Sequence, residues 1–217
     1  MYYSYVQQMP CQQRRRVMTV TGVGNLSVAP DTAQIQLEVR TENKQLNHAQ
    51  KENAYEMNQV IDSLLKLGIA KEDIQTVSYN ITPQYDYIDG KQVFRGYEVT
   101  NAINVKIADI DQVGNVIDVA VQNGANGVST IRFTVEDEQT DYQKALSLAL
   151  NDALLKAQTI AETMQVQLDP TPIKIVEERR AESGTPRMFS AKEMSGSTPI
   201  EQGQIMIKAT VTVQFQY

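Results

Sequence analysis

Hydrophobic and polar residues alternate along several stretches of the chain, and this pattern predicts most of its strands. In one stretch Ala33, Ile35, Leu37 and Val39 are apolar, and the residues between them are polar. A period of two with one polar face is typical of a half-buried strand in an antiparallel sheet. Strand character is also predicted over 17–28, 73–87, 97–107, 131–135, 173–178 and 205–217.

Three other stretches repeat apolar residues at spacings of three and four, which predicts amphipathic helices. They cover about 42–67, 110–124 and 140–169. In the last of them Ala149, Ala153 and Ala157 lie on the apolar stripe, which indicates close approach to a sheet or to another helix. Between two strands, Asp89-Gly90 is the signal for a two-residue hairpin turn.

The order of these elements is β-β-α-β-β-α-β-α-β-β, which predicts an α+β fold. We expect a mainly antiparallel sheet built of hairpins, with the three helices on one face. The other face is polar and meets either water or a neighbouring subunit. Residues 17–217 are expected to form a single domain after a flexible polar arm, 1–16. Within the domain, 179–203 is rich in Ser, Gly, Pro and Met, and it predicts a long mobile loop.

Composition and charge narrow the possible partners and the compartment. The 217 residues carry a net charge of −6, which argues against a nucleic-acid binder.

No apolar run is long enough for a transmembrane segment. The N-terminal sequence does not resemble a signal peptide, because Arg14–Arg16 follow its apolar residues. With Cys11 as its one cysteine, the chain makes no intrachain disulfide. We therefore expect a cytoplasmic protein, with the cell envelope as the alternative.

Residues that could carry catalysis are few. His48 is the only histidine, and it lies within a predicted helix but off its apolar stripe, while Cys11 lies in the polar arm. Asp109 and Asp111 could form a carboxylate site, but they precede a helix and are better interpreted as caps. The acidic run 136–138 is interpreted as a solvated strand end. We expect no enzyme activity, catalytic residue, cofactor or metal site.

Two glycine motifs suggest phosphate or anion binding at first sight. Gly22 and Gly24 follow a strand, but there is no third glycine at Ser27 and no helix follows directly. A dinucleotide fingerprint needs both, so these glycines indicate a bulge or a close approach in a β-hairpin. The glycines of the segment 124–127 could form an anion nest, although a tight helix-to-strand turn explains them better.

The predicted long hairpin carries a cluster of tyrosines. They are Tyr79, Tyr85, Tyr87 and Tyr97. Aromatic platforms that bind single-stranded nucleic acid have basic neighbours, whereas here Lys91 and Arg95 are outnumbered by acidic residues. Cross-strand packing or a subunit contact is therefore the favoured interpretation.

Five segments together resemble the SIMPL-domain family. The first holds Gly-x-Gly, then Pro-Asp-x-Ala and an alternating strand, over 20–39. The others match in the same order: 64–85 with Leu-x-x-x-Gly-Ile and Ile-x-Thr, 96–109 with Gly-Tyr-x-Val-x-Asn, 124–137 with Gly-Ala-Asn, and the alanine-rich 145–161. The resemblance covers about residues 17–217.

The resemblance implies a protein of the bacterial envelope or of stress responses, and a ring- or channel-like oligomer in at least one member. Many bacterial members have a signal peptide, which is the reason for the envelope alternative. The leading hypothesis is a non-enzymatic, self-associating module. The second is a ligand- or protein-binding module that uses the loop 179–203. A hydrolase that uses Asp109 and Asp111 is a third.

Overall fold

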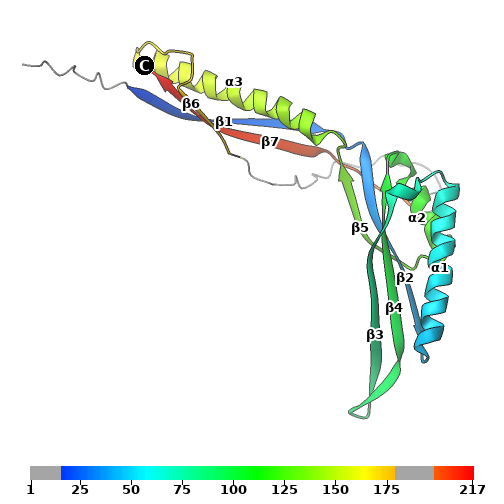
Figure 1. Cartoon of the computed structure of the whole chain (residues 1–217). Coiled ribbons are helices and arrows are strands. Elements are labelled where there is room, and N and C mark those ends of the chain that lie inside the picture. Colours follow the sequence, from blue (N-terminus) through cyan, green and yellow to red (C-terminus); the bar gives the residue numbers. More distant parts are fainter. Residues whose placement is uncertain (1–15, 179–197) are drawn as a thin grey trace, which may run out of the picture. The chain divides into compact units, whose positions relative to one another are not determined.

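The computed structural model describes residues 16–178 and 198–217 (Figure 1). Cys11, the arm 1–15 and most of the predicted loop lie outside these residues. The helices and strands are β1 (Val17–Val28), β2 (Thr32–Asn43), α1 (Leu46–Lys66), β3 (Ile74–Ile88), β4 (Lys91–Ile107), α2 (Val113–Gln122), β5 (Gly127–Thr134), α3 (Glu138–Met164), β6 (Lys174–Glu177) and β7 (Ile205–Gln216). Their order and the α+β class confirm the sequence prediction.

The strands form two sheets where the sequence led us to expect one. One sheet has four strands in the order β3-β4-β2-β5, and the other has three in the order β1-β7-β6. The division arises because β1 pairs with the last strand, β7, and not with β2, which follows it in sequence. Alternation along a strand shows that one face is buried but does not identify the neighbouring strand. The strands of both sheets are antiparallel, as predicted.

The chain divides into two compact units that we describe separately. Among the described residues, unit 1 contains 16–26, 139–178 and 206–217, and unit 2 contains 27–138 and 198–205. The single domain that the sequence predicts over 17–217 stays a prediction.

The core of unit 2 lies between its sheet and two helices. Ile35 and Leu37 of β2 are fully buried together with Val60 of α1 and Val116 of α2. These positions repeat every second residue in β2 and every third or fourth in the helices, so the helices cover one face of the sheet. On the opposite face the polar residues of β2 are only partly buried, which agrees with the predicted polar face.

A buried polar residue, Asn53, joins α1 to this sheet by hydrogen bonds. Asn53 has no exposed surface, and its Nδ2 donates to the carbonyl of Val39 at 2.8 Å and to that of Val99 at 3.1 Å. Because these carbonyls belong to β2 and β4, one amide group links α1 to two neighbouring strands. A buried donor is favourable only where it finds such acceptors, so the contact fixes the position of the helix.

In unit 1, two glycines let α3 approach β1 closely. A Cβ atom at Gly22 would overlap the backbone oxygen of Ala149 and lie 2.8 Å from Cβ of Ala153, and one at Gly24 would overlap the oxygen of Ala145. The buried face of α3 consists of alanines at every fourth residue from 145 to 161. This confirms the close approach that the sequence indicated for both features, but the expected β-hairpin is wrong, because β1 pairs with β7 and not with β2.

Turns and boundaries follow the sequence with small differences. Asp89 and Gly90 have φ values of 50° and 74°, which confirms the two-residue hairpin turn. The first helix begins at Leu46 and not near residue 42, because β2 continues to Asn43 in its pairing with β4.

Candidate interaction surface

The hairpin of β3 and β4 brings an aromatic cluster together. The rings of Tyr85 and Phe94 meet edge to face with centroids 5.7 Å apart, and those of Phe94 and Tyr97 with centroids 5.1 Å apart. The contact of Tyr85 with Phe94 joins the two strands, and that of Phe94 with Tyr97 lies within β4. Of the four tyrosines, Tyr85 thus makes the cross-strand packing that the sequence offered as one of two interpretations. Phe94 was not singled out there, although the two-residue turn at Asp89-Gly90 places it directly opposite Tyr85 in an unbroken register. The bulge between Gln84 and Tyr85 lies beyond this pair.

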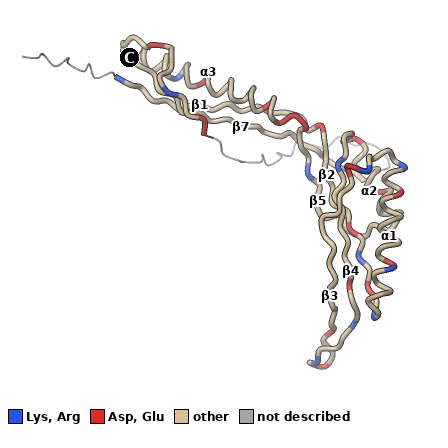
Figure 2. The backbone as a smooth tube through the Cα atoms, viewed as in Figure 1, with Lys and Arg blue, Asp and Glu red and all other residues tan. Residues whose placement is uncertain are grey.

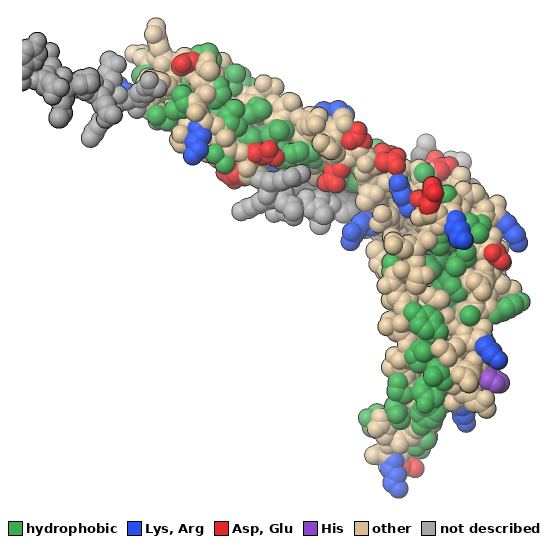
Figure 3. Space-filling view, viewed as in Figure 1, with side chains coloured by type: hydrophobic (Ala, Val, Ile, Leu, Met, Phe, Trp, Pro, Cys, Tyr) green, Lys and Arg blue, Asp and Glu red, His purple; other side chains and the backbone are tan. Residues whose placement is uncertain are grey.

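Much of this hairpin is apolar and exposed. Figure 3 shows hydrophobic side chains gathered along its length. Tyr87 is 77% exposed, and the remaining large hydrophobic side chains of β3 and β4 with more than a third of their surface exposed are Val77, Tyr79, Ile81, Tyr85, Ile88, Val93 and Phe94. Single exposed apolar residues are normal, but their number on this one hairpin makes it a candidate interaction surface.

Arg95, one of the two basic residues near the tyrosines, is already paired. Arg95 donates from Nε to Glu42 at 2.6 Å and from Nη2 to the same carboxylate at 2.8 Å, and it lies 3.5 Å from Asp86. The hydrogen bond with Glu42 is the main cause that raises the pKa of Arg95 above its ordinary value. A guanidinium between two carboxylates offers little attraction to a phosphate group, which weakens the nucleic-acid alternative for the tyrosines.

Of the two carboxylates considered for catalysis, that of Asp109 has structural partners. Asp109 Oδ1 accepts from the backbone N–H of Asp111 at 3.2 Å, and its Oδ2 accepts from the side chain of Gln112 at 2.9 Å. Asp109 thereby caps the short 3₁₀ turn Ile110–Gln112 before α2, as its position in the sequence indicated. His48 lies on α1 with an exposed side chain. The structure therefore does not place His48 and these carboxylates in one shared site.

The acidic run 136–138 also has structural contacts. Glu136 pairs with Lys106 at 3.0 Å, and its backbone N–H donates to Asp31 at 2.8 Å. The hydrogen bond that Lys106 donates to Glu136 raises the pKa of Lys106. Glu138 begins α3, where a carboxylate is favoured by the helix dipole.

The segment 124–127 forms the tight turn between α2 and β5. Gly124 has a φ of 116°, which a residue with a side chain rarely adopts. Asn126 then donates from Nδ2 to the carbonyl of Arg40 at 2.7 Å and accepts at Oδ1 from its N–H at 2.8 Å. The side-chain amide of Asn126 thus forms the same pair of hydrogen bonds with Arg40 of β2 that a neighbouring strand would form. This structural role explains the turn without anion binding.

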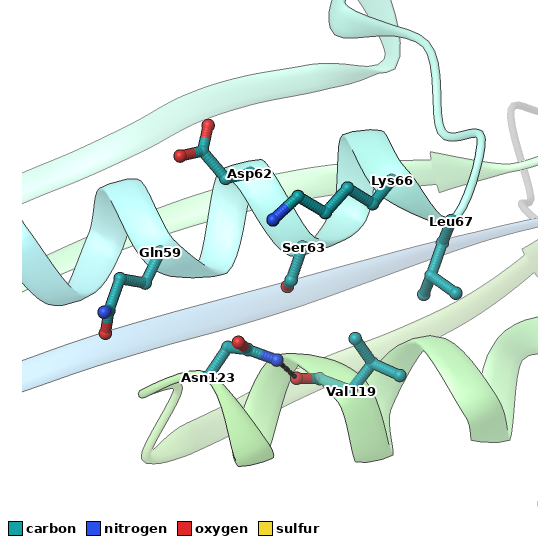
Figure 4. Close-up of a pocket in the computed structure, with 7 residues that line it drawn as sticks. All are labelled: Gln59, Asp62, Ser63, Lys66, Leu67, Val119 and Asn123. Carbon is teal, nitrogen blue, oxygen red and sulfur yellow. Dashed lines mark hydrogen bonds between the residues drawn. The ribbon is translucent and has the colours of Figure 1, made fainter.

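A shallow hollow of about 440 Å³ lies between α1 and α2 (Figure 4). It is lined by Gln59, Asp62, Ser63, Lys66, Leu67, Val119 and Asn123. Ser63 donates to the carbonyl of Val60 at 2.7 Å and Asn123 to that of Val119 at 2.7 Å, so each binds the backbone of its own helix. These two polar groups are therefore already occupied, and the hollow offers a ligand few convergent partners.

The described residues have neither a cluster of metal-binding side chains nor a membrane-spanning helix. No three His, Cys, Asp or Glu side chains in 16–178 and 198–217 lie together as a metal site would require. Among the helices of the same residues, none is both long and apolar enough to cross a membrane, which agrees with the sequence.

These features define an α+β protein of two antiparallel sheets with an exposed apolar hairpin. The chain belongs to the SIMPL family, described as protein of unknown function (DUF541), whose family model matches residues 18–215. This confirms the resemblance noted in the sequence.

Relatives of the chain come from bacteria. The chain is 29% identical to the 26 kDa periplasmic immunogenic protein of Brucella melitensis over 96% of this chain and 87% of the relative. It is 27% identical to the uncharacterized protein YggE of Escherichia coli over 92% of this chain and 82% of the relative. The periplasmic name contradicts the cytoplasmic placement that we expected, which rested only on how the N-terminal sequence begins.

Proposed function

We propose that this chain is a non-enzymatic, self-associating module of the bacterial cell envelope that builds a ring- or channel-like oligomer. The observation that carries the proposal is the exposed apolar surface of the β3–β4 hairpin. Its burial in a contact between copies would remove this surface from water, at about 25 cal/mol per Å² of apolar area. Placement in the envelope is supported by the name of the Brucella relative.

A non-catalytic role is supported by the partners of the candidate residues. Asp109 caps a turn, Glu136 pairs with Lys106, and the two glycines of β1 pack against α3. The absence of nucleic-acid binding is part of the same proposal, because Arg95 is held between Glu42 and Asp86. The stress-related role is drawn from the family resemblance.

A binding module that uses the loop 179–203 is the second candidate, and it has less support. Thr198 donates to Asp118 of α2 from its N–H at 3.1 Å and from its hydroxyl group at 2.5 Å. Ile200 packs against the core of unit 2. The described end of this loop is therefore held against the protein. Deleting residues 180–196 would separate the two candidates, because only the second predicts loss of partner capture with an unchanged oligomer.

The mass of the full chain in solution tests self-association. We expect size-exclusion chromatography with light scattering to give one discrete species at a multiple of the 24.3 kDa chain mass, over a range of micromolar concentrations. The species should persist in high salt, because apolar burial is not screened by ions. A chain that stays monomeric throughout this range would refute the proposal.

A further inference from the structure

The two outer strands of the four-stranded sheet have free edges. Its order is β3-β4-β2-β5, so β3 pairs only with β4 and β5 pairs only with β2. Within the part of the chain that the structure describes, no segment pairs with the outer side of either strand. Each therefore presents a row of backbone N–H and C=O groups to which another strand can bind.

The other sheet protects one of its outer strands. Asp152 of α3 accepts from the N–H of Val23 at 2.8 Å, and Lys156 donates to the carbonyl of Thr21 at 2.9 Å. Both backbone groups belong to β1, whose one neighbour in the sheet is β7. Side chains of α3 thus satisfy groups on the free edge of β1. No such contact is made to the outer edge of β3 or of β5 among the described residues.

The edge of β3 is also almost uncharged. Asp86 is the only charged residue of the strand, and the segment Ile74–Thr82 contains no charge, glycine or proline. Figure 2 shows this gap in the charged residues along β3. Proteins commonly protect edges with lysine, proline or bulges. Here Pro83 lies beyond the segment Ile74–Thr82, and one bulge interrupts that segment at Val77. Apart from this bulge, the segment Ile74–Thr82 is suited to strand addition.

The strand that fits this edge is β5 of a second copy. It is of similar length, has Arg132 as its one charged residue, and exposes Val128 and Ile131. Two copies that each carry a net charge of −6 repel one another, and this repulsion is weakest where charged residues are sparse. Pairing between two identical β3 edges would leave both β5 edges open, whereas pairing of β3 with β5 uses both edges.

Strand directions agree with this arrangement. Since β2 is antiparallel to both β4 and β5, and β3 is antiparallel to β4, the two outer strands run in opposite directions. A second copy in the same orientation therefore places its β5 antiparallel to β3 of the first. Each of these strands carries a bulge, at Val77 in β3 and at Ser129 in β5, where its alternation is interrupted.

We propose that copies of this chain assemble head to tail, with the segment Ile74–Thr82 of one copy paired to the outer edge of Gly127–Thr134 of the next. This inference rests on the proposed self-association and specifies its contact. A head-to-tail contact repeats from copy to copy, and it closes into a ring or continues as a filament according to the rotation between copies.

Charged substitutions on each edge test the contact. Val77→Lys on β3 and Ile131→Lys on β5 place a charge at positions that are 49% and 38% exposed. Each variant should have the mass of one chain in light scattering. Val121→Lys is the control, since this α2 residue is 51% exposed and lies on neither edge, and it should keep the wild-type mass. Circular dichroism establishes that each variant is folded, and Asn80→Lys replaces Val77→Lys if the latter unfolds.

Mixing the two edge variants gives the decisive result. Val77→Lys retains a free β5 edge and Ile131→Lys retains a free β3 edge, so an equal mixture should form a species of twice the chain mass. A mixture that stays at the mass of one chain, or an Ile131→Lys variant that still assembles, would overturn the head-to-tail contact. If the wild-type chain is itself monomeric, self-association fails. If it assembles and the edge variants assemble equally well, only this contact fails.

Discussion

At the scale of single residues, the close contact between β1 and α3 depends on the missing side chain of Gly22. An added Cβ would overlap the carbonyl oxygen of Ala149, which is backbone and cannot move without shifting the helix. Ala153 lies against the same point through its Cβ. The glycines of β1 and the alanine stripe of α3 therefore pack against each other in one contact.

Gly22→Ala should lower the free energy of unfolding by about 1–3 kcal/mol, the usual cost of overpacking a close contact. Urea denaturation followed by circular dichroism measures the change. Asn25→Ala is the matched control, because this residue is exposed on the same strand, and it should change stability by less than about 0.5 kcal/mol. Equal effects of the two substitutions would contradict the proposed role of Gly22.

At the scale of elements, α3 both packs on the three-stranded sheet and covers the edge of β1. Asp152 receives hydrogen bonds from Lys156 at 2.7 Å and from the N–H of Val23. The hydrogen bond with Lys156, followed by that with Val23, lowers the pKa of Asp152 below its ordinary value of 3.8. A helix that satisfies strand groups in this way prevents further strands from adding at that edge.

The lowered pKa of Asp152 gives stability a defined pH dependence. Its contribution is fully present above the ordinary pKa of an unfolded aspartate and is lost as the pH falls through the lower folded value. Asp152→Asn should therefore be less stable than the wild type at pH 7, and the difference should shrink below about pH 4. Denaturation midpoints of both proteins from pH 7 to pH 3 measure it. A constant difference across this range would show that the carboxylate charge is not the cause.

At the scale of the whole molecule, each unit has its own buried residues. Unit 2 buries Leu37 with the apolar faces of α1 and α2, and unit 1 buries Val211 and Phe215 of β7 with the alanines of α3. A core that is complete within one unit allows that unit to open by itself.

Leu37→Ala should destabilise unit 2 by about 2–5 kcal/mol through the cavity that it leaves. Native-state hydrogen exchange should then show faster exchange in β2 and β4, while β7 keeps most of its protection. Ala substitution of the exposed Leu155 on α3 is the control and should leave both regions unchanged. Equal loss of protection in β7 would instead support the single cooperative domain that the sequence predicts.

Much of the fold could be predicted because local patterns record local structure. The alternation in β2 and the helical stripes of α1 and α2 identify elements and their buried faces, and Asp89-Gly90 identifies a turn. The interaction surface was predicted only in part. Tyr85, Tyr87 and Tyr97 were singled out as packing or contact residues, but Phe94 was not, although the turn at Asp89-Gly90 already places it opposite Tyr85.

The sequence by itself determined the α+β class, the order of elements, the family and the polar second face of the strands, since each depends on residue type and spacing along the chain. Only the tertiary structure decided that β1 pairs with β7, that α3 covers the edge of β1, and that β3 and β5 remain open at the edges of the other sheet. These are relations between residues far apart in the sequence. They depend on which surfaces fit together in space. The periodicity along one strand shows which of its faces is buried, but not which strand or helix lies beside it.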